Sequence, residues 1–379
     1  MKKGVLYAIL TGCFLTASIC MTGCGETQEQ AAPPTANGKP HSLDEQVEDI
    51  VKSMSMPEKI GQMVMIGVDG TDVTEDSLFM LHQYHMGGVT LFDRNMESKE
   101  QVRLLTEHLQ KQSGEKLPLF IAVDEEGGAV VRMRDQLPAL PSQEEIGASG
   151  DPGQAKEWAR TIGTLVKDMG INTNFAPVAD VGFDRGRSYG KDPDTVAAFV
   201  DQACKGYEEN KVYFSLKHFP GIGRGMVDSH IEVSNIDISL EELLASDLKP
   251  FQTIVEGHEP DGYFIMVSHL KYPQIDAQEP ASLSSAITTG VLREKLGYNG
   301  IIITDDLAMG AVSKYNSFRE LGVKAILAGA DIALICHEYP NQQEVYLGIL
   351  DAVEKGIISE ERINESLRRI VKTKLKYLK

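Results

Sequence analysis

Apolar and polar positions are arranged in blocks along most of the chain: short apolar runs are separated by stretches that repeat with the period of an amphipathic helix. After residue 42, eight of the runs are mostly continuous rather than alternating, which is typical of strands buried on both faces of a parallel sheet. The runs predicted as strands are Gln62–Val68, Gly88–Phe92, Leu119–Asp124, Asn172–Asp180, Tyr213–Phe219, Gly262–His269, Gly300–Asp306 and Ala330–Cys336.

The stretches between these runs carry helix start and stop signals. Ser55–Glu58 and Ser98–Gln101 have the sequence of a capping box. Asp151–Met169 opens with an Asp-Pro pair and is followed by Gly170, as a capped helix should be. Ser359–Leu378 has acidic residues in its first turn and lysines in its last, which matches the helix dipole.

Strands that alternate with helices in this way predict the α/β class and a single (β/α)8 barrel of the TIM type over residues 42–379, with room for irregularity in its first units. An open doubly wound sheet is the competing architecture. It usually carries a glycine-rich phosphate-binding turn after its first strand, and this sequence has no such turn. No break in composition marks a second domain.

The first 23 residues have the pattern of a bacterial lipoprotein signal peptide. Lys2 and Lys3 precede an apolar run, and two small residues then precede Cys24, which resembles a lipobox with Cys24 as the lipidated residue. The letters before Cys13 match a lipobox better, but cleavage there would leave too short an apolar run. An uncleaved anchor helix and an ordinary signal peptide are the alternatives.

Residues 24–41 are rich in Gln, Ala, Pro, Thr and Gly without an apolar period, which predicts a flexible tether. We therefore expect the protein to be an extracytoplasmic, membrane-anchored lipoprotein. It would contact the membrane only through its N-terminal lipid.

Composition narrows the function classes further. The chain of 379 residues has 42% hydrophobic residues, which excludes wholesale disorder. Its net charge of −18 makes it a poor candidate for nucleic-acid binding, because phosphate contacts need clustered Lys and Arg. Its five cysteines cannot build a disulfide scaffold at this length, and three of them lie in the first 24 residues. Cys204 and Cys336 are predicted to be small buried residues.

Polar residues gather where the predicted strands end, which is where a barrel carries its chemistry. Each of them has a structural interpretation as well: a lone His is often a satisfied core group, and an Asp-Asp pair often caps the following helix. So many charges at one rim are costly to bury without partners or a ligand. These strand-end residues are Asp124, Glu125, Glu126, Asp180, Arg187, Lys217, His218, His269, Asp305, Asp306, His337 and Glu338.

Three segments carry a resemblance to a known family. Lys217–His230 reads KHFPGIGRGMVDSH, Ile303–Met309 reads ITDDLAM and Asp124–Arg132 reads DEEGGAVVR. They resemble the signature segments of glycoside hydrolase family 3, in its β-N-acetylglucosaminidase branch. The resemblance runs from Met54 to His337, and it also covers Gly87–Asn95, Asn174–Val181 and Ala328–Asp331.

The resemblance implies a catalytic set. Asp305 corresponds to the nucleophile that forms a covalent glycosyl-enzyme intermediate, and Asp306 to its support or to a helix cap. Asp228 and His230 correspond to an acid/base dyad, in which the carboxylate orients the imidazole. Because Asp228 and His230 are two residues apart, an extended loop would project them to the same side.

The resemblance also implies the residues that bind the sugar. These are Asp124, Arg187, Lys217 and His218. Asp180 and His269 are further candidates that would orient Lys217 or Arg187, and Met309 is a candidate for the pocket wall.

The sequence departs from the family pattern in one loop. Ile222–Gly225 reads IGRG where the family commonly has His-Gly-Asp-Thr. Arg224 is new there; it would meet an acidic leaving group, such as a muramic lactyl or peptide carboxylate, or it is an ordinary solvated arginine.

The function implied is that of a retaining exo-β-N-acetylglucosaminidase, which removes terminal β-linked N-acetylglucosamine from peptidoglycan fragments or related glycans. The expected partner is this carbohydrate substrate, and the protein is expected to be a monomer. A phosphorylase or a β-glucosidase of the same family is the enzymatic alternative. The non-enzymatic alternative is a sugar-binding surface lipoprotein, although such proteins have two lobes and this chain has no such division. No cofactor and no metal site are expected, since the sequence has no paired Cys or clustered His spacing.

Overall fold

The computed structural model describes residues 42–378 except 114–116, 135–136, 183–185 and 226–233. Its eight strands form one parallel sheet in the order β7-β6-β5-β4-β3-β2-β1-β8. The strands are β1 Val64–Gly67, β2 Gly88–Leu91, β3 Phe120–Val123, β4 Thr173–Asn174, β5 Tyr213–Phe219, β6 Tyr263–Val267, β7 Ile301–Thr304 and β8 Ala333–Ile335.

The two ends of this sheet meet and close it into a barrel. A parallel bridge joins Ile303 of β7 to Ile332, which directly precedes β8, and the backbone N–H of Thr304 donates to the carbonyl of Ile332 at 3.1 Å. The predicted (β/α)8 barrel is therefore confirmed. Its first units are regular: β1 pairs in parallel with both β2 and β8.

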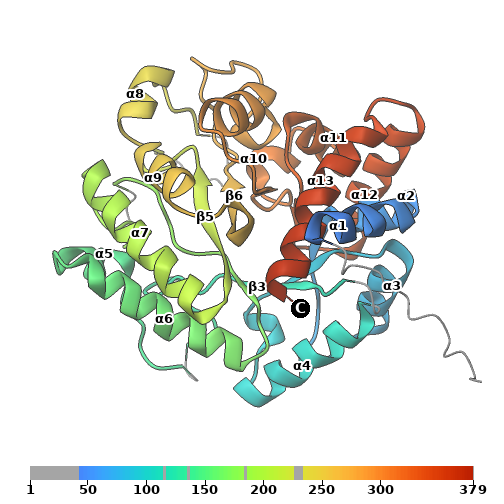
Figure 1. The fold of residues 1–379 in the computed structure, drawn as a ribbon, viewed down its shortest axis with the longest axis horizontal. Helices are drawn as coiled ribbons and strands as arrows, with labels where there is room; N and C mark the ends of the chain where they lie inside the picture. The colour runs from blue at the N-terminus through green and yellow to red at the C-terminus, as the bar shows by residue number, and fades with distance from the viewer. Residues whose placement is uncertain (1–41, 114–116, 135–136, 183–185, 226–233, 379) are drawn as a thin grey trace, which may run out of the picture. The chain divides into compact units, whose positions relative to one another are not determined.

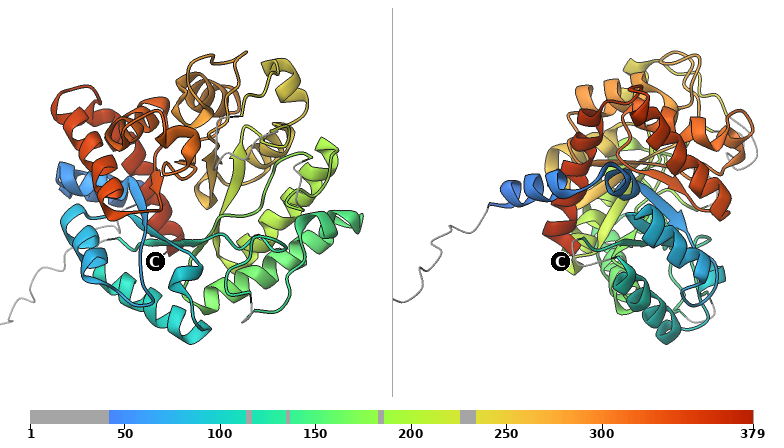
Figure 2. Two further views of the ribbon diagram at one scale, coloured as in Figure 1. Left: turned by 180° about the vertical axis from the view of Figure 1, so that it is seen from behind. Right: turned by 90° about the vertical axis from the view of Figure 1, so that its right-hand side faces the viewer.

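Helices lie outside the strands in every view (Figure 1 and Figure 2). Most intervals between strands hold at least one helix, as a parallel barrel requires for its crossovers. The helices are α1 Leu43–Ser53, α2 Met56–Gln62, α3 Glu75–Tyr84, η1 Asp93–Asn95, α4 Lys99–Gln112, α5 Gln143–Ala148, α6 Pro152–Asp168, α7 Pro193–Asn210, α8 Leu240–Ala245, α9 Lys249–Gly257, η2 Pro260–Gly262, η3 Ala281–Leu283, η4 Ala286–Lys295, α10 Gly310–Ser313, α11 Phe318–Ala328, α12 Tyr339–Glu354, α13 Glu360–Thr373 and η5 Lys374–Leu378.

The predicted helix starts are largely confirmed. Ser55 forms the expected reciprocal capping box of α2, and Asp151 caps α6. At α4 the prediction was half right: Ser98 accepts from the backbone N–H of Gln101, but the Gln101 side chain accepts from Glu97 rather than from Ser98. The C-terminal helix also ends earlier than predicted, because α13 passes into the π-helical segment η5.

The fourth strand is much shorter than the predicted run. β4 holds two residues, Thr173 and Asn174, instead of nine. Pro177 lies in the lost part, and proline has no backbone N–H to give to a sheet ladder. The chain then rejoins the sheet by an isolated bridge between Val178 and Lys217, so it still ends on the same rim as its neighbours.

The strands are buried along their whole length, as their continuous apolar sequences predict. Rings fill part of the barrel interior: Phe264 of β6 makes edge contacts with Phe120 and Tyr213, at centroid distances of 5.0 and 4.6 Å. Cys204 and Cys336 are buried free thiols, which confirms the prediction for both.

A buried carboxylate, Asp331, ties the C-terminal helix to the last strand. Its Oδ1 accepts from the hydroxyl of Ser366 at 2.6 Å and pairs with Arg369 at 3.0 Å, both on α13, and its Oδ2 pairs with Arg293 of η4. Burial alone would raise the pKa of Asp331, but Arg293, Arg369 and Arg362 lower it. Asp331 lies two residues before β8, so α13 and η4 together neutralise a charge next to the strand that closes the barrel.

A buried amine, Lys374, lies near the N-terminal ends of the strands. Its Nζ donates to Gln62 Oε1 and to the Gly87 carbonyl, both at 2.7 Å, and lies 4.9 Å from the ring centre of Phe120. No carboxylate is paired with it among the described residues. Burial therefore lowers the pKa of Lys374 to about 7.

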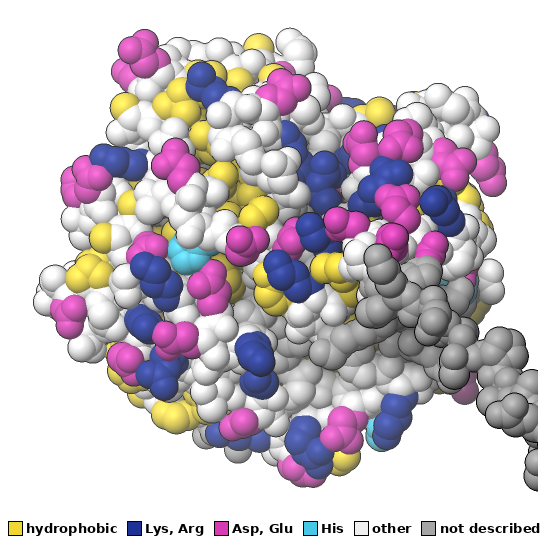
Figure 3. Space-filling view, in the orientation of Figure 1, with side chains coloured by type: hydrophobic (Ala, Val, Ile, Leu, Met, Phe, Trp, Pro, Cys, Tyr) yellow, Lys and Arg dark blue, Asp and Glu magenta, His cyan; other side chains and the backbone are white. Residues whose placement is uncertain are grey.

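Charges on the surface are mixed rather than gathered. On the face shown in Figure 3, acidic and basic side chains lie interspersed among the helices, so the net charge of −18 forms no single patch in that view. None of the helices in the described part of the chain combines the length and the apolar character needed to cross a membrane.

The buried Lys374 predicts a pH-dependent stability. Between pH 7 and about 10, the unfolded chain carries a proton on this lysine that the folded chain lacks, since the ordinary pKa is near 10.5. The free energy of unfolding should therefore rise with pH over this range more steeply in the wild type than in Lys374→Met, by up to about 1.4 kcal/mol per pH unit. Urea titrations at several pH values measure both slopes.

Lys372→Met is the matched control for this experiment. Lys372 pairs with Asp261 at 3.2 Å and is partly exposed, so its removal should leave the slope unchanged. Parallel pH profiles for the wild type and Lys374→Met would contradict the prediction.

Candidate active site

Asp305 directly follows β7 and is half-buried at the rim. Its backbone N–H donates to the Val267 carbonyl of β6 at 2.9 Å, and its Oδ1 accepts from the N–H of Asp306 at 2.8 Å. Burial alone would raise the pKa of Asp305, but the imidazoles of His218 and His269, the Asp306 N–H and the Lys217 ammonium lower it below its ordinary value. The carboxylate is therefore ionised at neutral pH.

Asp306 and His269 hold the backbone that carries Asp305. Asp306 Oδ1 accepts from the N–H groups of Ala308 at 2.9 Å and Cys336 at 3.0 Å, which links the end of β7 to the end of β8. His269 Nε2 donates to the Asp306 carbonyl at 2.9 Å, and its Nδ1 lies 2.7 Å from Ser282 Oγ. The prediction of Asp306 as a support is consistent with these contacts, while its oxygen caps a turn rather than a long helix.

A cluster of four charged side chains joins the ends of β3, β4 and β5. Lys217 Nζ lies 2.7 Å from Asp124 Oδ1 and 2.6 Å from Glu126 Oε1. The Arg187 guanidinium donates two parallel hydrogen bonds to the Glu126 carboxylate, each of 2.8 Å. The side chains of Lys217 and Glu126 are each only 2% exposed, whereas Asp124 and Arg187 are each 21% exposed and lie nearer to solvent.

Each charge in this cluster keeps its neighbour ionised. Burial opposes ionisation of Glu126, but Lys217 and Arg187 outweigh it and lower the pKa of Glu126 to about 2. Burial likewise opposes the charge of Lys217, yet Asp124 and Glu126 raise the pKa of Lys217. The same balance, with Glu126 as the main partner, raises the pKa of Arg187.

His218 is held by Asp180 beside this cluster. Asp180 Oδ2 lies 2.7 Å from His218 Nδ1, and Oδ1 accepts from the backbone N–H groups of His218 and Ile222. His218 Nε2 lies 3.4 Å from a nitrogen of Arg187. Asp180 and His269 were expected to orient Lys217 or Arg187; their hydrogen bonds instead orient His218 and the backbone after Asp305.

Two site residues were missed by the reasoning from sequence. Glu126 was noted only as a polar strand end, and Arg132 only as part of a motif. Arg132 lies 3.4 Å from Asp124 Oδ2 and 3.2 Å from Asp93 Oδ2, and its guanidinium lies 5.3 Å from the ring centre of Phe92. The sequence places Glu126 beside Asp124 and Glu125 at one strand end, and only the fold shows which of these acids pairs with both Lys217 and Arg187.

Glu125, next to Asp124, has a different role. Its Oε2 accepts from the backbone N–H of Arg132 at 2.9 Å, while its backbone bonds the Asn174 side chain in both directions. Burial raises the pKa of Glu125 to about 8. It is thus a mostly protonated residue that holds the turn between Asp124 and Arg132.

The remaining candidates lie in several places. Arg224 forms an ion pair within the protein. Its Nε lies 2.9 Å from the buried Asp247, although the Arg224 side chain is 52% exposed. Met309 is buried and directly precedes α10. Asp228, His230 and Cys24 lie outside the described residues.

The arrangement brings an ionised, half-buried carboxylate and a set of hydrogen-bonding side chains to one rim. They come from the ends of β3, β4, β5, β6 and β7. Such a rim can hold the hydroxyl groups of a sugar while a nucleophile attacks it. Among the described side chains, no three from His, Cys, Asp and Glu converge as metal ligands.

Comparison with known proteins identifies relatives of this rim and barrel. The family model described as "Glycosyl hydrolase family 3 N terminal domain" matches residues 55–373. Beta-hexosaminidase from Idiomarina loihiensis is 34% identical over 312 residues, which cover 80% of this chain and 92% of the relative. Beta-hexosaminidase A from Pseudoalteromonas piscicida is 34% identical over 328 residues, which cover 78% of this chain and 54% of the relative.

A solved structure gives the same result for the fold. The glycoside hydrolase family 3 β-N-acetylglucosaminidase from Paenibacillus sp. superposes with a TM-score of 0.83 at 35% identity, over 86% of this chain and 63% of that protein. The chain thus spans nearly all of one relative and a little over half of two others.

The charged cluster predicts a large effect of removing its shared carboxylate. Glu126→Ala leaves Lys217 and Arg187 facing each other in a buried place, which should lower the free energy of unfolding by about 3–5 kcal/mol. Urea unfolding at pH 7 measures it. Glu361→Ala, which breaks an exposed pair with Arg368, should cost less than about 1 kcal/mol. Equal effects of the two substitutions would contradict the prediction.

Proposed function

The chain belongs to glycoside hydrolase family 3, and from that premise we propose that it is a retaining exo-β-N-acetylglucosaminidase. The observation that carries the proposal is Asp305, a half-buried carboxylate at the end of β7 whose neighbours lower its pKa and keep it ionised. Most glycosidases that retain configuration use such a carboxylate as their nucleophile.

In the first step, a carboxylate oxygen of Asp305 forms a bond to C1 of the sugar while the bond from C1 to the leaving oxygen breaks. Oδ1 accepts the Asp306 N–H, and Oδ2 has no hydrogen-bond partner within the described part of the chain. Oδ2 is therefore the attacking atom. His230 gives its proton to the leaving oxygen, with Asp228 stabilising the imidazolium.

In the second step, water replaces Asp305 at C1. His230, now neutral, takes a proton from the water as its oxygen bonds to C1 and the bond to Asp305 breaks. The sugar leaves with its original configuration, because two inversions have occurred. The nucleophile is restored as a carboxylate.

The sugar is held by the cluster beside the nucleophile. Asp124 and Arg187 are the more exposed members, so they lie nearest to the sugar hydroxyls or the acetamido oxygen. Lys217 and His218 complete the set, and Arg132 adds a further donor near Asp124. Glu126 lies beneath them and fixes the positions of both cations.

The relatives and the cationic donors support the proposed substrate class. Proteins named beta-hexosaminidase are 34% identical to this chain, and Lys217 and Arg187 suit an acetamido carbonyl. We propose terminal β-linked N-acetylglucosamine on peptidoglycan fragments as the natural substrate, and hydrolysis rather than phosphorolysis as the reaction.

Asp305→Asn should remove the nucleophile while keeping its shape. We expect kcat for an aryl β-N-acetylglucosaminide to fall by at least ~10³-fold, because an amide cannot form the glycosyl ester. Release of the aryl chromophore measures the rate. Asp306→Asn is the matched control: its amide oxygen can still accept from Ala308 and Cys336, so it should change kcat by less than about ten-fold.

Two results would contradict this part of the proposal. One is a wild-type enzyme that cleaves the aryl β-glucoside but leaves the aryl β-N-acetylglucosaminide intact. The other is a fluorinated mechanism-based sugar that forms a covalent adduct on a residue other than Asp305, as peptide mass spectrometry would reveal.

We also propose that the protein is an extracytoplasmic, membrane-anchored lipoprotein, attached through Cys24. Support comes from the sequence: a positively charged start, an apolar run and small residues before this cysteine. Residues 24–41 would act as the tether between the lipid and the barrel.

Cys24→Ala tests the attachment. The wild type, expressed in a bacterium fed with an alkyne-tagged fatty acid, should incorporate the label and sediment with membranes. The variant should incorporate none, since it lacks the thiol that accepts the lipid. Cys13→Ala is the control and should label as the wild type does; loss of label in Cys13→Ala instead would move the attachment site.

A further inference from the structure

Glu125 lies at the base of a tight turn that joins Asp124 to Arg132. The tip of the turn is closed by an antiparallel bridge between Gly127 and Val130, in which the backbone N–H of Gly127 donates to the Val130 carbonyl at 3.2 Å. The base is closed by a side chain: Glu125 Oε2 accepts from the backbone N–H of Arg132 at 2.9 Å. Glu125 therefore fixes the point at which Arg132 leaves the turn.

Arg132 extends from this turn toward the proposed sugar site. Its terminal nitrogens lie 3.4 Å from Asp124 Oδ2 and 3.2 Å from Asp93 Oδ2. Its Nε is buried and has no hydrogen-bond partner among the described residues. Both contacts are longer than an ordinary hydrogen bond between nitrogen and oxygen, so they hold the guanidinium weakly. Its position therefore depends on the backbone that Glu125 fixes.

The Glu125 carboxyl group has no cation to pair with in the described part of the chain. Arg134, near the tip of the turn, is exposed and donates to the carbonyl groups of Gly128 and Ala129. The cations beside the turn are paired with other carboxylates, and these pairs are Arg132–Asp124, Arg132–Asp93, Lys217–Asp124, Lys217–Glu126 and Arg187–Glu126. Three cations thus face three carboxylates, and Glu125 would be an unpaired fourth.

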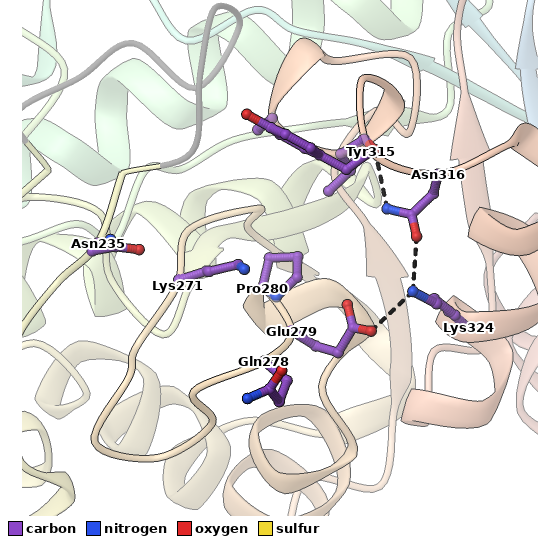
Figure 4. A pocket seen from close by; sticks show the side chains of 10 residues that line it. Asn235, Lys271, Gln278, Glu279, Pro280, Tyr315, Asn316 and Lys324 are labelled. Atoms are coloured by element: carbon purple, nitrogen blue, oxygen red, sulfur yellow. Dashed lines mark hydrogen bonds and ion pairs between the residues drawn. The ribbon is translucent and has the colours of Figure 1, made fainter.

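Burial makes such an unpaired charge costly. Glu279 shows the usual arrangement for a partly buried glutamate: its side chain is 32% exposed and pairs with Lys324 at 2.9 Å, as drawn in Figure 4. Glu125 is only 1% exposed, and its Oε1 is buried without a hydrogen-bond partner among the described residues. A neutral carboxylic acid is much less costly at such a place than a carboxylate.

The groups that face Glu125 favour the same protonation state. Burial raises the pKa of Glu125 to about 8, and the carboxylates of Asp93 and Asp124 also raise it. The backbone N–H and the charge of Arg132 act in the opposite direction. The Tyr207 hydroxyl, on α7, interacts with Glu125 too, and burial raises the pKa of Tyr207 and keeps it neutral.

We propose that Glu125 is a positioning residue that acts as a neutral acid and holds Arg132 where a sugar hydroxyl or acetamido group meets it. When Glu125 loses its proton, its new charge attracts the Arg132 guanidinium and repels Asp124. Arg132 then turns from the sugar toward Glu125, and sugar binding weakens. This inference rests on the proposed glycosidase function and adds a proton-dependent control of its sugar affinity.

Unfolding at several pH values tests the neutral form without any sugar. From about pH 4.5 to about pH 8, a folded chain with protonated Glu125 binds one proton more than the unfolded chain. The unfolding equilibrium constant of the wild type should therefore rise with pH relative to that of Glu125→Gln, by up to about ten-fold per pH unit. Urea titrations within this pH window measure the ratio.

Sugar affinity tests the action on Arg132. In the wild type, KM for the aryl β-N-acetylglucosaminide and Ki for competing N-acetylglucosamine should both rise about ten-fold from pH 7 to about pH 9.5, the effect of losing one charge-assisted contact. In Glu125→Gln both constants should stay flat, because the amide oxygen still accepts from the Arg132 N–H and never becomes charged. At each pH, kcat of the two enzymes should match.

Two further variants serve as control and as a test of the route. Glu75→Gln, an exposed glutamate on α3, should reproduce the wild-type profiles in both experiments. Arg132→Leu should have a high KM already at pH 7 and no further rise, because no guanidinium is left for Glu125 to hold.

Three results overturn the proposal. The first is an unfolding ratio between the wild type and Glu125→Gln that does not change with pH, which would mean that folded Glu125 is ionised. The second is a Glu125→Gln enzyme whose KM and Ki rise as in the wild type. The third is a pH-dependent rise that survives in Arg132→Leu.

The experiments also separate this inference from the proposed function. Cleavage of the aryl β-N-acetylglucosaminide by the wild type at neutral pH tests the glycosidase function by itself. The unfolding profiles test the neutral acid without any substrate. The two proposals can therefore fail separately.

Discussion

Two cations, Lys217 and Arg187, share one buried carboxylate, Glu126, and the rim of the barrel is organised around this triad. Each charge would be costly to bury alone, and the pair of contacts from Glu126 keeps all three ionised. Because Lys217 belongs to β5, Glu126 follows β3 and Arg187 follows β4, the triad also fixes three neighbouring strand ends relative to one another. Asp124 and His218, which we propose bind the sugar, lie beside this triad.

The barrel was predictable from the sequence because its strands are continuous apolar runs, and their positions agree with the structure to within a few residues. The short length of β4 was harder to predict from the sequence. It depends on whether Pro177 stands at a position where the neighbouring strand requires a backbone N–H donor. Asp305, Lys217 and His218 were found from motifs at strand ends. Glu126 was not, because its role is defined by two cations that lie 61 and 91 residues away in the chain and meet it only after folding.

Buried ionisable groups have different partners at the two ends of the barrel. At the rim with Asp305, carboxylates and cations are paired, so the site remains ionised and polar. Near the other end, the acceptors that Lys374 meets among the described residues are neutral, and burial lowers its pKa to about 7. The first arrangement keeps charge available to a ligand; the second closes the barrel with an amine that is largely uncharged at alkaline pH.

Asp331 has a consequence for the order in which the protein is made. Arg293 precedes Asp331 in the chain and is available to its carboxylate early, but Ser366 and Arg369 are among the last residues to leave the ribosome. The nascent chain therefore completes the contacts at the seam between β7 and β8 only when synthesis is nearly finished.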